Sequence, residues 1–112
     1  MFGIRVKAFC RNENLVLKQW FKEEMTMYKN IMKAYKNGKD DIDRYFRAVM
    51  NDSIMENKKN DAIECIYYIG KTFMLSLILS ADFGIDTSKE REAMKKIKNY
   101  LQFDVLGKLE AV

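Results

Sequence analysis

The chain offers few side chains for covalent or metal chemistry. It contains no histidine, the commonest general base and the commonest metal ligand in proteins. Its two cysteines, Cys10 and Cys65, lie far apart and follow no metal-ligand spacing, and this usage favours a reduced, cytoplasmic compartment. No second carboxylate shares a helical face with Glu24, so a di-metal site inside a helix bundle is unsupported. We therefore expect a protein that is not an enzyme and that uses no cofactor and no metal.

Basic side chains are concentrated in the first third of the chain. Residues 1–39 contain nine Lys or Arg and three Asp or Glu, within a chain whose net charge is +4. Five lysines recur at helical spacing and form one stripe, which we call the lysine stripe: Lys18, Lys22, Lys29, Lys33 and Lys36. Such a stripe can bind a phosphate backbone or an acidic protein, and it is also the ordinary solvated face of a lysine-rich helix. Nucleic-acid binding is therefore one hypothesis for the function, although side chains that could contact bases are sparse.

Glu24 is the one carboxylate in the middle of the apolar arc of the helix expected there. A carboxylate in such a position is costly unless it is paired or exposed. Glu24 is accordingly either an anchor for a basic side chain of a partner or a residue at the edge of the arc that reaches water.

The most apolar stretch, residues 62–85, predicts a helix that other elements or lipid must surround. Glu64, Lys71 and Asp82 fall on one narrow stripe of this helix, which predicts a seam that faces water. Leu77 lies on the opposite face and is expected in the core. Apolar residues beside the seam predict an exposed patch of the kind that marks protein interfaces, unless another segment of the chain covers it. The expected patch contains Tyr67, Tyr68, Leu75, Ile78 and Leu79.

A membrane span is not expected from this stretch. The apolar run 65–81 is shorter than the roughly 20 residues that a bilayer requires, and Lys71 interrupts it. Ser76, Ser80 and Gly84 recur at every fourth position on the opposite side of the helix. Small residues at this spacing predict a close crossing with another helix of the same chain.

Apolar periodicity and helix-capping signals divide the chain into helices. Gly38 is a candidate C-terminal cap, and the spacing of Thr87 and Glu90 is that of a capping box. The expected helices span about 14–36, 41–56, 61–84 and the residues after Thr87. Short connections make consecutive helices antiparallel neighbours. Residues 2–9 fit either a short β-strand or a helix.

We thus predict an all-α protein, a single helical-bundle domain over residues 1–112, with four helices running up and down around the central apolar helix at about 61–84. A helical domain with spare apolar surface and no chemical motif is typical of a protein that works by binding. The leading hypothesis is a small inhibitor or regulator that contacts a larger protein or itself, as a homo-oligomer. A composition rich in Lys, Asn, Ile and Met is typical of a low-GC bacterial or phage gene. The alternative is a nucleic-acid-binding regulator that uses the lysine stripe.

Overall fold

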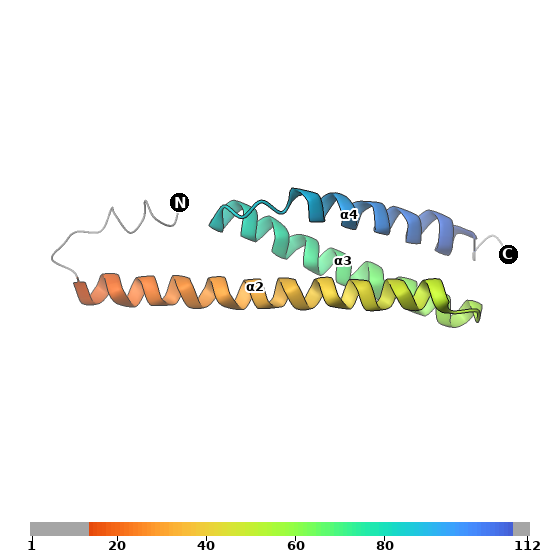
Figure 1. Ribbon diagram of the computed structural model, residues 1–112, viewed down its shortest axis with the longest axis horizontal. Helices are drawn as coiled ribbons and strands as arrows, with labels where there is room; N and C mark the ends of the chain where they lie inside the picture. Colours follow the sequence, from red (N-terminus) through yellow and green to blue (C-terminus); the bar gives the residue numbers. More distant parts are fainter. Residues whose placement is uncertain (1–13, 109–112) are drawn as a thin grey trace.

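The computed structural model describes residues 14–108, which form three long antiparallel helices (Figure 1). They are α2 (Asn14–Asn51), α3 (Met55–Phe83) and α4 (Ser88–Asn99), and α4 continues into wider π-helical turns, η1 (Tyr100–Leu106). Residues 14–108 contain no strand, so the all-α prediction is confirmed. The four-helix bundle is wrong. The segment 2–9, for which a strand or helix was expected, lies outside the described residues.

The first two expected helices are one continuous helix, α2. Gly38 does not cap a helix end but is buried in the middle of α2, where a Cβ atom would lie 2.1 Å from Thr72 Oγ1 of α3. The glycine therefore allows the two backbones to approach closely. The acidic residues after it support the interior of α2, since the Asp41 carboxylate accepts a hydrogen bond (2.9 Å) from Arg44 on the next turn.

The apolar helix α3 is central, as expected, although it begins earlier than the sequence pattern indicates. It contacts α2 as well as α4 and η1, and Figure 1 shows the C-terminal part of α3 between α2 and α4. The buried cluster draws on every one of these elements and comprises Ile42, Val49, Ala62, Cys65, Ile69, Met94, Leu101 and Val105. Side chains of α2, α4 and η1 therefore meet along the buried face of α3.

The loop from α3 to α4 is fixed by hydrogen bonds that differ from the expected capping box. Gly84 ends α3 in the left-handed conformation (φ 70°), which a glycine adopts without strain. The hydroxyl of the buried Thr87 donates to the Ser76 carbonyl oxygen (2.9 Å) and does not cap α4. The Asp86 carboxylate accepts the backbone N–H of Ser88, the first residue of α4 (3.0 Å).

The molecule is a rod with extents of 69 × 19 × 16 Å. At 1.5 Å per residue, a helix of the length of α2 spans about 57 Å. Its N-terminal end reaches beyond the C-terminal end of α3 (Figure 1). A rod made of so few helices covers each helix on part of its circumference only, and the described residues 14–108 leave one face of α3 uncovered.

Candidate protein-binding surface

The uncovered face of α3 carries apolar residues at alternating spacings of four and three. We call this set the outer α3 stripe; its members are Ile63, Tyr67, Gly70, Met74, Leu77 and Ala81. All of them are exposed, with exposed fractions of 49% for Ile63, 61% for Tyr67, 65% for Met74 and 46% for Leu77. This spacing is that of the a and d positions of a coiled coil, which pack against a neighbouring helix.

The buried face of α3 explains why large apolar side chains point outward. It carries the small residues Thr72 and Ser76, both with 0% exposure, because α2 approaches closely at Gly38. The close crossing is thus at Thr72, one turn before the expected stripe of Ser76, Ser80 and Gly84, of which Ser76 is buried and Gly84 ends the helix. Because small residues fill the crossing, the bulky side chains of Met74 and Leu77 lie on the opposite side.

The patch expected from the sequence is rotated relative to the surface observed. Tyr67 is exposed, as that expectation required. Tyr68 is half-buried and stacks on Tyr45 of α2, with ring centroids 5.4 Å apart. Leu75 and Ile78 are also half-buried, so they lie at the edge of the uncovered face.

Two placements from the sequence are wrong. Leu79 is fully buried and is not part of an exposed patch, whereas Leu77, expected in the core, is 46% exposed. The charged residues Glu64, Lys71 and Asp82 are exposed, but they lie along one edge of the uncovered face. The sequence pattern places these three residues at the centre of the water-facing side of α3. The buried face expected from that placement is therefore rotated about the helix axis relative to the buried face in the structure.

The lysine stripe forms a second, separate surface that begins on the N-terminal half of α2 and extends past its middle. Each of its five lysines is exposed. From Lys18 to Lys36 the stripe covers about 27 Å of helix at 1.5 Å per residue. Glu24 lies on the same half of α2 and is half-buried.

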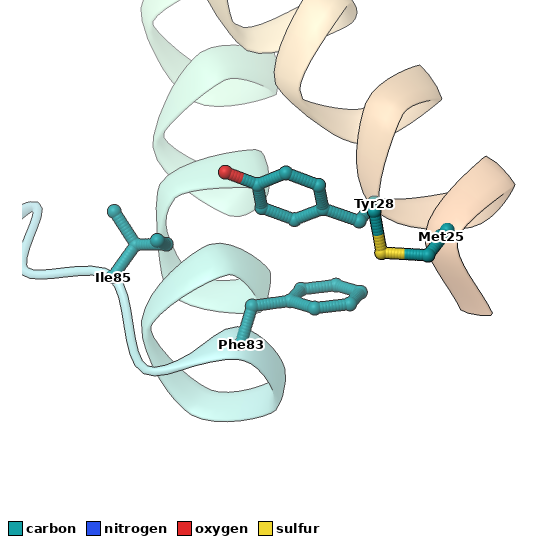
Figure 2. Close-up of a pocket in the computed structure, with 4 residues that line it drawn as sticks. All are labelled: Met25, Tyr28, Phe83 and Ile85. Atoms are coloured by element: carbon teal, nitrogen blue, oxygen red, sulfur yellow. The ribbon is translucent and has the colours of Figure 1, made fainter. Parts of the chain in front are cut away.

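An apolar cleft of about 210 Å³ lies where the end of α3 meets α2, and Figure 2 shows its lining residues. Tyr28 and Phe83 pack there with ring centroids 5.2 Å apart and an interplanar angle of 60°. Met25 and Ile85 complete the lining. Ligand sites orient their ligands with several convergent polar groups, whereas the Tyr28 hydroxyl is the one side-chain polar atom among these four residues. The lining of the cleft therefore does not indicate which class of ligand it would bind.

The described residues contain no cluster of metal ligands and no reactive thiol. Among residues 14–108, no group of three or more His, Cys, Asp or Glu could hold a metal ion. The thiol of Cys65 is buried and donates to the Ile42 carbonyl oxygen at 3.5 Å. Burial raises the pKa of the Cys65 thiol to about 11, which disfavours the reactive thiolate.

Within the described part of the chain, α3 is the one helix long and apolar enough to cross a membrane by length and composition. One third (33%) of its most apolar window is buried inside the molecule. The core helix of a soluble protein meets the same criteria, so this property does not by itself identify a span.

Comparisons with protein-family models, with curated proteins and with solved structures found no match. Function must therefore be inferred from the surfaces of α2 and α3 themselves.

Proposed function

We propose that this protein is a small non-enzymatic binding protein, of inhibitor or regulator type, that holds an α-helix of a protein partner along the outer α3 stripe. The observation that supports this most is the regular 4-3-4-3-4 spacing of exposed apolar residues from Ile63 to Ala81. That spacing matches the contact seam of one helix against another, because a and d side chains insert between those of the facing helix.

The size of the stripe sets the strength of binding. Full burial of a large apolar side chain contributes about 1.5–3 kcal/mol, so covering four that are half-exposed contributes roughly 3–6 kcal/mol. Association itself costs at least about 4 kcal/mol in lost translational and rotational freedom. A partner helix must therefore also contact the charged edge, where Glu64 and Lys71 are exposed.

Photo-crosslinking in living cells tests this function. Benzoylphenylalanine replaces Tyr67 in one variant and Phe103 in a control, because Phe103 on η1 is also aromatic and equally exposed (65% against 61%). We expect a protein adduct from position 67 and a much weaker one from position 103. Adducts with lipid alone, or none at position 67, would contradict the proposal.

A second candidate function is nucleic-acid binding through the lysine stripe. It is favoured by the exposure of all five lysines on one face of α2. Phosphate contacts release counterions, so affinity for duplex DNA or RNA would fall steeply between 50 and 200 mM salt, by about 10³-fold or more for several contacts. Substitution of Lys22 and Lys29 by Glu would abolish such binding and leave the adduct at Tyr67 unchanged.

A further inference from the structure

We propose that the outer α3 stripe binds α3 of a second copy of this chain, in antiparallel orientation, with Tyr67 of each copy packed over Gly70 of the other. This rests on the proposed function, because it names the helix that occupies the same surface.

Gly70 is the first observation that points to a close neighbour beyond the described residues 14–108. It lies in the interior of α3, where glycine costs about 1 kcal/mol relative to alanine. A Cβ atom at Gly70 would meet nothing within 4 Å, whereas one at Gly38 would clash with Thr72. Contacts among residues 14–108 therefore account for Gly38 but not for Gly70. A helix packed from outside, with a large side chain over position 70, accounts for it.

The order of large and small residues selects an antiparallel second copy. A twofold axis between Tyr67 and Gly70 sets each Tyr67 opposite a Gly70 and each Ile63 opposite a Met74. The Tyr67–Gly70 contact sets a large side chain against the smallest residue, as tight interdigitation requires. A parallel pair would instead set Gly70 against Gly70, leaving a void, and Tyr67 against Tyr67, crowding the same seam.

Charge complementarity selects the same register. Glu64 and Lys71 directly follow stripe residues and occupy the flanking positions that form ion pairs between helices. With the axis between Tyr67 and Gly70, each Glu64 lies beside Lys71 of the second copy, which gives two symmetric ion pairs. A shift of one heptad, with Gly70 opposite Met74, brings the two Lys71 side chains together.

A lipid surface fits this face less well. Helices that lie on membranes combine bulky apolar residues with a polar face rich in Lys and Arg. The outer α3 stripe has Gly70 at its centre, and the carboxylates of Glu64 and Asp82 lie along its edge. These features favour a protein helix of complementary shape and charge.

Sedimentation equilibrium of the full chain tests the second copy. We expect a dimer whose dissociation constant rises about tenfold or more in Glu64→Lys and in Lys71→Glu, because each change sets like charges together. The double variant Glu64→Lys with Lys71→Glu restores the ion pairs and the dimer. Asp82→Lys makes the same charge change on the same edge outside the paired positions, and it should leave the dissociation constant within about threefold of the original.

Gly70→Leu separates packing from folding in the same experiment. Leucine has the higher helix propensity, so the melting temperature of the monomer should not fall, yet the side chain fills the slot for Tyr67 and the dimer should be lost. A chain that is monomeric at all concentrations, a dimer insensitive to the Glu64 and Lys71 variants, or flotation of a monomer with phosphatidylglycerol vesicles would overturn the proposal. If a monomer still gives an adduct with another protein at Tyr67, only the second copy is wrong; without any protein adduct, the proposed function fails as well.

Discussion

The backbone of Gly38 on α2 lies directly against the side chain of Thr72 on α3, where a Cβ atom on the glycine would fall 2.1 Å from Thr72 Oγ1. This crossing determines how α3 is rotated about its axis. Because Thr72 and Ser76 turn toward α2, Met74 and Leu77 turn outward. The apolar surface that we assign to binding is thus a consequence of how closely the two helices pack.

Replacement of Gly38 by Ala should destabilise the fold by roughly 1–3 kcal/mol, the usual cost of an inserted methyl group that the surroundings cannot accommodate. Urea unfolding at low protein concentration measures this. Gly70→Ala is the matched control, because its Cβ meets open space, and it should stabilise the monomer by up to about 1 kcal/mol. Equal effects of the two substitutions would contradict the close crossing.

The buried hydroxyls of Thr72 and Thr87 should respond oppositely to replacement by valine. Among the described residues, Thr72 Oγ1 has no hydrogen-bond partner, whereas Thr87 Oγ1 donates to the Ser76 carbonyl oxygen and accepts from Arg91. Thr72→Val should therefore cost nothing or raise stability by up to about 1 kcal/mol, while Thr87→Val should lower it by about 1–3 kcal/mol. Thermal unfolding compares them, and a larger loss in Thr72→Val would show that its hydroxyl is paired.

Leu77 and Leu79 should differ sharply when replaced by Asp. Leu79 is fully buried, so an unpaired charge there should cost several kcal/mol and unfold the protein. Leu77→Asp should keep a helical circular dichroism spectrum and a melting temperature close to that of the original chain, while association is lost. If Leu77→Asp unfolds the isolated chain, α3 is rotated differently from the structure described above.

Stability should decline in alkali because of Cys65. Burial raises the pKa of this thiol from 9.0 to about 11, so the folded state keeps the proton to a higher pH than the unfolded chain. The contribution is fully present below pH 9 and is lost as the pH rises toward about 11. Urea unfolding between pH 8 and 11 should show a shallower decline for Cys65→Ala than for the original chain. Parallel declines would mean that the thiol is accessible to water in the folded protein.

The sequence predicts helix content well because its apolar periodicity is strong and Gly84 marks a real helix end. It misplaces Gly38 because glycine serves equally at a helix C-terminus and at a close helix crossing, and only the partner side chain of Thr72 distinguishes the two. Because Gly38 is interpreted as a helix end, the sequence pattern predicts two helices where the structure has α2 alone, and hence a four-helix bundle.

The proposed binding surface is harder to predict than the helices. Hydropathy favours burial of Leu77 and exposure of Thr72, and the structure has the reverse because close packing selects for small side chains. The 4-3 spacing from Ile63 to Ala81 is present in the sequence, but only the positions of α2 and α4 show that this face of α3 is exposed. The sequence pattern predicts the exposure of Tyr67 correctly, because Tyr67 lies on both the expected and the observed face.

A cysteine pair placed across the proposed seam tests the second copy most directly. In a chain with Cys10→Ser, one preparation carries Ile63→Cys and another, with an added tag, carries Met74→Cys. Disulfides form between residues whose Cα atoms lie about 4.4–6.8 Å apart, and in the antiparallel register Ile63 faces Met74 of the other copy. Oxidation of the mixture should give the mixed 63–74 disulfide, and each preparation alone should give none. Disulfides between two copies of residue 63 or two copies of residue 74, or no disulfide in the mixture, would contradict the antiparallel pairing of α3 with itself.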